Sequence, residues 1–268
     1  MIPKIIHYSW FSTDPIPELA QRCMVSWKKY LPGYELVCWD RAKADECELP
    51  FLQEALQEQK WAFAADVIRC YAVYTYGGIW LDTDVELFRG LDDMLDHKLF
   101  IGKEAFSTFN VADSFGHISQ LTAHCFGAEA GHPFMKQCLE YYTDRHFITS
   151  KDERLPMSLR YDMRVLPEIM ALIAANAFGY CGSPAREEDV EPLDDNMVAY
   201  PYYVFDMPRY HGVEEVYTIH YQQGGWTQGQ AVVRTDRGLR KKDLKYYLFS
   251  FLNHFLKSRR LKIRVISY

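Results

Sequence analysis

The chain has 268 residues, of which 49% are hydrophobic, 15% aromatic and 25% charged. This composition supplies a packed core and excludes a disordered, collagen-like or low-complexity protein. Thirty Lys and Arg residues against 36 Asp and Glu residues give a formal net charge of -6. No apolar run approaches the roughly 18 residues of a membrane-spanning helix, and the first residues lack the layout of a signal peptide. We therefore expect a cytoplasmic protein.

The charge is unevenly distributed along the chain. Residues 234–268 contain eleven Lys or Arg and two acids, a net charge of +9, which leaves -15 for residues 1–233. Between Leu244 and Phe255, apolar residues of this tail recur at helical spacing. A basic amphipathic helix suits an anionic membrane surface, but a C-terminal helix packed on the body predicts the same pattern, and both interpretations stay open. The acidic body argues against nucleic-acid binding.

Predicted strands and helices alternate in the first part of the chain. Strands are expected over residues 3–10, 34–39 and 79–82, with helices over residues 17–30 and 61–76 between them. This alternation predicts an α/β fold with a mixed, largely parallel central sheet flanked by helices. Ligands of such sheets bind at the carboxyl ends of the strands.

The rest of the chain is less regular. The His132-Pro133 pair predicts a helix that runs to Tyr142, and a second helix is expected over residues 164–178. Residues 182–196 are expected to form an acidic loop. Residues 216–221 are expected to form a strand that leads into Gly224-Gly225-Trp226.

Asp82 and Asp84 stand one residue apart, directly after the apolar run Ile79-Trp80-Leu81. Both carboxylates can turn toward one divalent cation where the strand becomes a loop, and oxygen ligands favour Mg²⁺ or Mn²⁺. An Asp-x-Asp pair is common in surface turns, but an unpaired charge is costly beside an apolar strand. An EF-hand is excluded, because Leu87 and Asp93 stand where its loop needs Gly and Glu.

Three segments carry a resemblance to a known family. Residues 2–11 read Ile-Pro-Lys-Ile-Ile-His-Tyr-Ser-Trp-Phe, residues 63–69 read Phe-Ala-Ala-Asp-Val-Ile-Arg, and residues 76–85 read Tyr-Gly-Gly-Ile-Trp-Leu-Asp-Thr-Asp-Val. They resemble the DXD-containing sugar transferases of glycosyltransferase family 32, which include the yeast initiating mannosyltransferase and bacterial capsular-polysaccharide enzymes. More distantly, they look like the catalytic domain of the clostridial glucosylating toxins. The resemblance implies a GT-A-type nucleotide-sugar-binding fold.

The resemblance assigns roles to the catalytic and metal-binding residues. It implies that Asp66 and Arg69 hold the hydroxyls of the donor hexose. Asp82 would contact the ribose and the sugar, or the metal through water. Asp84 would bind the metal, with His220 as the third ligand. Asp66 and Arg69 lie three residues apart on one helix face and can reach the pocket of Asp82, although an exposed salt bridge has the same spacing.

Further residues complete the implied donor site. Trp10 matches the position where an aromatic ring stacks on the nucleotide base, although a Trp at a strand end is more often part of the core. His7, Thr83, Gly225 and Trp226 belong to the same donor-binding set. Gly225 stands where the family often has Ser, which leaves backbone amides to contact the β-phosphate.

The sequence thus predicts a metal-dependent glycosyltransferase that uses Mn²⁺ or Mg²⁺. It would move a hexose from a UDP- or GDP-sugar to a glycan or lipid-linked oligosaccharide in cell-surface polysaccharide synthesis, and the resemblance implies retention of configuration. The alternatives are a nucleotide-sugar hydrolase, a protein-modifying effector transferase and a non-catalytic membrane-associated binding protein.

The expected organisation is one catalytic domain followed by the basic tail. Residues 1–233 would form this domain, with a donor-binding part to about residue 115 and an acceptor part over about residues 116–233. The tail over residues 234–268 adds the option of peripheral attachment to the inner face of the membrane.

Overall fold

The computed structural model describes residues 1–104, 112–113, 116–206 and 215–222. Two residues of the expected donor site, Gly225 and Trp226, lie outside the described residues. The expected domain boundary after residue 233 and the basic tail also lie outside them.

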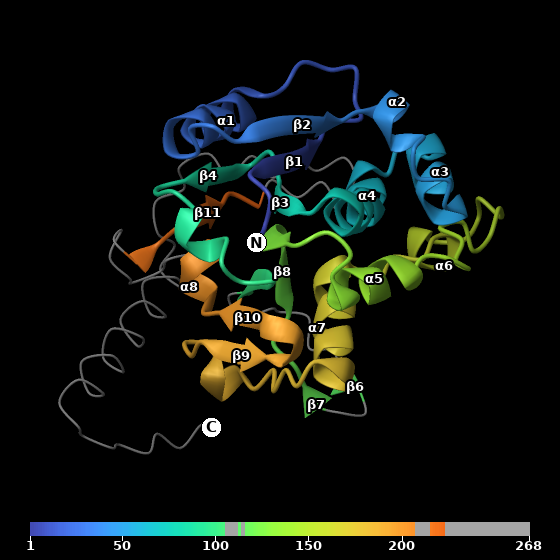
Figure 1. Cartoon of the computed structure of the whole chain (residues 1–268). Coiled ribbons are helices and arrows are strands. Elements are labelled where there is room, and N and C mark those ends of the chain that lie inside the picture. Colours follow the sequence, from blue (N-terminus) through green and yellow to red (C-terminus); the bar gives the residue numbers. More distant parts are fainter. Residues whose placement is uncertain (105–111, 114–115, 207–214, 223–268) are drawn as a thin grey trace, which may run out of the picture. The chain divides into compact units, whose positions relative to one another are not determined.

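A seven-stranded sheet forms the centre of the described chain (Figure 1). Its strands, in spatial order, are β2 (Glu35–Trp39), β1 (Ile5–Ser9), β3 (Gly78–Leu81), β8 (Leu121–Ala128), β5 (Leu99–Lys103), β10 (Met197–Tyr200) and β9 (Glu191–Leu193). The strands β2, β1, β3, β5 and β10 run in one direction, and β8 and β9 run in the other. The prediction of a mixed, largely parallel sheet is confirmed.

Two small sheets accompany the central one. The strand β4 (Val85–Leu87) pairs with β11 (Thr218–His220), and β6 (Ala112–Asp113) pairs with β7 (Gly116–His117), both antiparallel. The pairing of β4 with β11 brings together segments about 130 residues apart in the chain.

Helices cover the sheet. They are α1 (Glu18–Tyr30), α2 (Arg41–Ala44), α3 (Pro50–Gln57), α4 (Trp61–Tyr76), α5 (Pro133–Glu140), α6 (Met157–Arg160), α7 (Leu166–Ala177) and α8 (Tyr202–Phe205). Short 3₁₀ turns lie at Asp92–Met94, Pro184–Arg186 and Asp194–Asn196. None of the described helices combines the length and the hydropathy that a membrane span requires.

Both faces of the central sheet are buried, as a sheet with helices on both sides requires. Trp80 and Ile101 point into a core shared with α3, α4, α5 and α7. Ile79 and Leu81 point into the opposite core, which contains Trp27 of α1 and residues of β4 and α8. Because side chains alternate along a strand, the next residue after Leu81, Asp82, faces the side of α4.

A glycine pair makes the connection from α4 to β3 very short. The N–H of Gly77 still donates to the carbonyl of Val73 at 3.0 Å, and the chain then enters β3 directly. Gly77 has φ +66, and a Cβ there would lie 2.7 Å from the backbone nitrogen of Ala130. Only glycine fits this position. The tight connection keeps α4 against the strand that ends at Asp82.

The expected acidic loop over residues 182–196 contains a strand, which corrects the prediction. β9 pairs antiparallel with β10 at the edge of the sheet. The buried Lys103 anchors the preceding segment, because its Nζ donates to the carbonyls of Arg186 and Asp189 at 2.7 and 2.9 Å and lies 3.1 Å from the Glu191 carboxylate. An otherwise polar segment is thereby fixed to the sheet.

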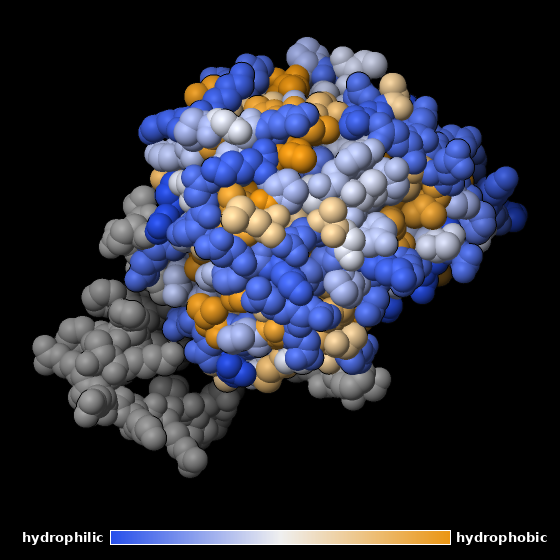
Figure 2. Space-filling view, viewed as in Figure 1, coloured by the Kyte–Doolittle hydropathy of each residue, from blue (hydrophilic) through white to orange (hydrophobic). Residues whose placement is uncertain are grey.

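The surface is mainly hydrophilic on the face shown in Figure 2, with hydrophobic residues scattered across it. Among the described residues, the exposed large hydrophobic side chains are those of Met1, Val25, Tyr76, Leu159 and Val190. Scattered apolar residues of this kind are ordinary on a protein surface.

Candidate active site

Asp82 stands at the carboxyl end of β3, where a tight turn leads to β4. Its N–H donates to the carbonyl of His124 on β8 at 2.9 Å, and its Oδ1 accepts from Nε1 of Trp80 at 2.7 Å. The N–H of Val85 donates to the carbonyl of Asp82 at 3.0 Å and closes the turn. These bonds fix the backbone that carries both Asp82 and Asp84.

The pairing of β4 with β11 places His220 beside the two carboxylates. His220 is opposite Val85 in the register, and its Nε2 lies 3.4 Å from Oδ1 of Asp84. One ligand atom each from Asp82, Asp84 and His220 lie within 4.8 Å of one another. Two carboxylates and an imidazole fit a divalent cation, and Mn²⁺ accepts this mixed set more readily than Mg²⁺, which prefers oxygen ligands.

His220 has an electrostatic environment that favours a bound positive charge. Burial lowers the pKa of its imidazole, but the neighbouring carboxylates of Asp84, Asp82 and Asp206 outweigh burial and raise it to about 9. The same surroundings that hold a proton on this ring would attract a cation.

Arg69 lies between two carboxylates at the inner side of this site. Its Nη2 is 3.3 Å from Oδ1 of Asp82 and 3.5 Å from Oδ1 of Asp66. It also donates from Nη1 to the carbonyl of Ala123 on β8. Asp66 and Arg69 are 1% and 4% exposed, so the pair is not the exposed salt bridge that its spacing alone also allows.

Asp66 joins this cluster to the start of α7. Its Oδ2 accepts from the N–H of Leu166, the first residue of α7, at 3.1 Å. Its buried Oδ1 has no hydrogen-bond partner among the described residues. Burial raises the pKa of this carboxyl to about 7, although Arg69 and the Leu166 N–H oppose the shift. A carboxyl that is partly protonated near neutral pH can either donate to or accept from a sugar hydroxyl.

His7 lies in the core, which argues against its predicted contact with the donor. Nε2 donates to the carbonyl of Gly77 at 2.9 Å, and Nδ1 accepts from Nε1 of Trp39 at 3.1 Å. Both ring nitrogens are therefore occupied, near the start of β3 rather than the end that carries Asp82. Burial lowers the pKa of His7 to about 4, consistent with a neutral ring. We reassign His7 to the support of the α4–β3 connection.

The positions of Trp10 and Thr83 neither support nor contradict their predicted contacts with the donor. Both are half-buried. Trp10 follows β1, and its Nε1 donates to the carbonyl of Asp14 at 2.9 Å. Thr83 lies between the two aspartates in the turn. Their roles stay predictions.

Sequence reasoning missed three polar residues close to the site. His124 stacks on His220 with ring centroids 4.0 Å apart, and Asp206 has a carboxylate oxygen 3.9 Å from His220 Nδ1. Glu104 follows β5, and burial, with a smaller contribution from Asp206, raises the pKa of its carboxyl to about 8. Each is a single polar residue with no local motif, and only tertiary contacts between distant parts of the chain bring it to the site.

Comparison with known proteins identifies the segment that carries the DXD pair. The family described as "Glycosyltransferase sugar-binding region containing DXD motif" matches residues 17–101. This segment resembles a glycosyltransferase sugar-binding region. The match includes α4, with Asp66 and Arg69, and the turn with Asp82 and Asp84. The recognition of a DXD-containing sugar-transferase segment is thereby confirmed.

Curated relatives include fungal mannosyltransferases. Inositol phosphoceramide mannosyltransferase 3 of Schizosaccharomyces pombe is 31% identical over 140 residues, 51% of this chain and 36% of that protein. Mannosyl phosphorylinositol ceramide synthase SUR1 of Saccharomyces cerevisiae is 32% identical over 111 residues, 38% of this chain and 28% of that protein. The chain thus spans about a third of the length of these relatives.

Among solved structures, the PaToxG glycosyltransferase superimposes with a TM-score of 0.45 at 14% identity, covering 65% of this chain and 69% of that one. At this level of similarity, the description of the fold rests on the strand order and directions given above.

Proposed function

We propose that the protein is a metal-dependent glycosyltransferase that moves a hexose from a UDP- or GDP-sugar to a glycan or lipid-linked acceptor. The observation that carries the proposal is the meeting of Asp82, Asp84 and His220, whose ligand atoms lie within 4.8 Å of one another, with both aspartates inside the matched sugar-transferase segment. A non-catalytic binding protein would not require this arrangement.

Different residues would act on the diphosphate end and on the sugar end of the donor. Asp82, Asp84 and His220 would hold Mn²⁺ or Mg²⁺. A divalent cation supplies charge neutralisation for a departing diphosphate. Arg69 stays charged between Asp66 and Asp82, so it can orient donor hydroxyls without moving.

Retention of configuration is part of the proposal. The resemblance supports it, and the stereochemistry of the product tests it. Glu104 adds a carboxylate to this end of the sheet that the sequence did not suggest, and its raised pKa suits a proton-holding role near neutral pH.

The names of the relatives suggest which donor and acceptor to test first. They name mannose transfer and an inositol phosphoceramide acceptor. We therefore infer a mannose donor and an inositol-containing lipid headgroup as the first pair to test, with lipid-linked oligosaccharides of cell-surface polysaccharide synthesis as the second acceptor class. A cytoplasmic location with peripheral contact at the membrane is also part of the proposal.

The test is release of nucleoside diphosphate from a panel of UDP- and GDP-sugars, with Mn²⁺ and with chelator. Wild type is compared with Asp84→Asn and with Asp144→Asn, which changes an exposed aspartate after α5. We expect turnover of one donor that requires Mn²⁺ and is lost only in Asp84→Asn. Metal-independent turnover, or silence across the panel with all acceptors, would contradict the proposal. Equal release with and without acceptor would identify a hydrolase instead.

A further inference from the structure

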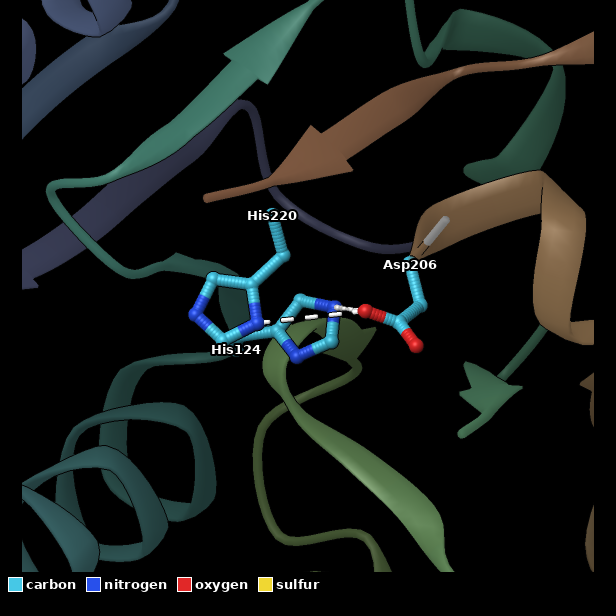
Figure 3. Close-up of side chains that lie close together, drawn as sticks. All are labelled: His124, Asp206 and His220. Carbon is cyan, nitrogen blue, oxygen red and sulfur yellow. Dashed lines mark ion pairs between the residues drawn. The ribbon is translucent and has the colours of Figure 1, made fainter. Parts of the chain in front are cut away.

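Asp206 places a carboxylate oxygen beside two stacked imidazole rings, those of His220 and His124 (Figure 3). Its Oδ1 lies 3.9 Å from Nδ1 of His220 and 4.0 Å from Nε2 of His124. The side chain is buried, at 1% exposure. His220 therefore faces Asp84 with Nε2 and Asp206 with Nδ1.

Backbone contacts hold Asp206 in this place. Its N–H donates to the carbonyl of Tyr202 at 3.0 Å, which ties it to α8. The N–H of His220 donates to the carbonyl of Asp206 at 3.1 Å. Thr218, two residues before His220, donates from Oγ1 to the carbonyl of Phe205. The end of α8 and the strand β11 are thus joined on both sides of the carboxylate.

The three side chains could in principle hold a second cation, because ligand atoms of His124, Asp206 and His220 lie within 4.8 Å of one another. The hydrogen bonding of His124 argues against it. Its Nε2 lies 3.1 Å from the carbonyl of Phe205. A carbonyl only accepts, so Nε2, the nitrogen that faces Asp206, carries the hydrogen and cannot also bind a metal. The two rings also stack face to face, with 23° between their planes, rather than pointing their edges at one centre.

We propose that Asp206 is a positioning residue that holds the Nδ1–H of His220, so that Nε2 is presented to the cation bound by Asp82 and Asp84. This inference rests on the proposed function. An acceptor at one ring nitrogen keeps the hydrogen there and leaves the lone pair on the other. A carboxylate in this position also raises the basicity of the ligand and fixes the orientation of the ring.

The separation of 3.9 Å exceeds a hydrogen bond, so the proposed contact requires a rotation of one of the two side chains. The stacked His124 limits the rotation of His220 to movement within the plane of its own ring. Asp206 therefore acts through His220 and does not itself bind the cation.

The test measures Mn²⁺ binding by electron paramagnetic resonance, with Mn²⁺ alone and with UDP or GDP added. Wild type is compared with Asp206→Asn, Asp206→Ser and His220→Ala. Coupling of Mn²⁺ to ¹⁴N reports a directly bound imidazole. We expect this coupling in wild type and its loss in His220→Ala. In both Asp206 variants we expect a roughly 10- to 100-fold loss of affinity and weaker coupling.

Tyr217→Phe is the matched control, because it removes the hydrogen bond from Tyr217 to Asp93, one residue before β11, without changing a contact of Asp206. We expect it to lose stability toward urea and to keep the affinity and the ¹⁴N coupling of wild type. Asp206→Ser serves as the second variant if Asp206→Asn does not fold.

The outcomes separate the two claims. Asp206 variants with wild-type affinity and coupling, when His220→Ala has lost the coupling, would overturn the role of Asp206 and leave the proposed function standing. Wild type that binds no Mn²⁺ with or without nucleotide, or binds it without ¹⁴N coupling, would overturn the proposed metal site and the inference together.

Discussion

Arg69 is the only cation that the described residues place between Asp66 and Asp82, and it is almost fully buried. Breaking a buried ion pair by removing one partner leaves an uncompensated charge, which typically costs about 3–5 kcal/mol. We predict that Arg69→Gln lowers the free energy of unfolding by about 3 kcal/mol, at the low end of that range, since the raised pKa of Asp66 lets that carboxyl take up a proton in response. Urea denaturation of wild type and variant at pH 7 measures this decrease in the free energy of unfolding.

An exposed pair supplies the control for this prediction. Lys136 and Glu140 form an i,i+4 pair on α5 with both side chains 57% exposed. Such pairs contribute little, so Lys136→Gln should leave the free energy of unfolding within about 0.5 kcal/mol of wild type. Equal effects of the two substitutions would show that burial does not strengthen the Arg69 pairs.

His7 makes the stability of the protein sensitive to acid. Its pKa is about 4 in the folded chain, below the usual 6.5, because the ring is buried. Between pH 6.5 and 4 the unfolded chain binds a proton at this residue and the folded chain does not. The free energy of unfolding therefore falls as the pH falls through this range, by roughly 3 kcal/mol from this residue.

His7→Gln removes that titration. The free energy of unfolding of wild type should fall between about pH 7 and 4.5 by about 2–3 kcal/mol more than that of His7→Gln. Denaturation with urea at both pH values measures the difference, and other titrating groups cancel in the comparison. Parallel behaviour of the two proteins would contradict the assignment of His7 as a neutral core residue.

Some residues of the site could be predicted from the sequence and others could not. Asp82 and Asp84 follow an apolar strand, and Asp66 and Arg69 share one face of a long helix, so local spacing was enough to group them. His7 was misassigned because its position in a matching segment does not reveal which end of the strand its ring reaches. Its hydrogen bonds to Gly77 and Trp39 depend on tertiary structure.

At the scale of elements, the junction of α4 and β3 sets the distance between Arg69 and Asp82. We predict that Gly77→Ala lowers the free energy of unfolding by about 3 kcal/mol. A side chain at φ +66 is strained, and its Cβ would meet the backbone of Ala130 and the ring of Pro3. The affinity for Mn²⁺ and nucleotide should fall as well, since the helix must shift relative to the strand.

Gly33→Ala is the matched control. Gly33 also has a positive φ, +85, but a Cβ at this position would meet no atom of the described residues within 4 Å. In Gly33→Ala, backbone strain alone should lower the free energy of unfolding by about 1–2 kcal/mol and leave the affinity for Mn²⁺ and nucleotide unchanged. Thermal or urea denaturation ranks the two variants. A Gly77→Ala protein no less stable than Gly33→Ala would show that the junction tolerates movement.

Some helices and strands were easier to predict from the sequence than others. The expected helix over residues 61–76 has the observed bounds of α4, because a long apolar face and a glycine pair mark both its body and its end. The strand β8 was not predicted from the sequence. Its eight residues are all buried and mix small, polar and aromatic side chains, so they show no alternation. Its place in the middle of the sheet, antiparallel to both neighbours, follows from tertiary pairing alone.

At the scale of the whole molecule, the site depends on contacts between distant parts of the sequence. Asp82 and Asp84 belong to the segment that matches the sugar-transferase family, while His124, Asp206 and His220 come from the part of the chain expected to bind the acceptor. Two pairings bring His124 and His220 to the aspartates, β3 with β8 and β4 with β11, and the N–H of His220 donates to the carbonyl of Asp206. The DXD turn was therefore predictable, but its surroundings required the structure.

The central claim is that Asp82, Asp84 and His220 form a cation-dependent site for a nucleotide sugar. Its most direct test is calorimetric titration of the protein with UDP and with GDP, in Mn²⁺ and in chelator, for wild type and Asp84→Asn. We predict binding of one nucleotide in Mn²⁺, with loss of at least tenfold in affinity, or about 1.4 kcal/mol, in chelator or in Asp84→Asn. Equal affinity under all these conditions, in variants that remain folded, would contradict the account.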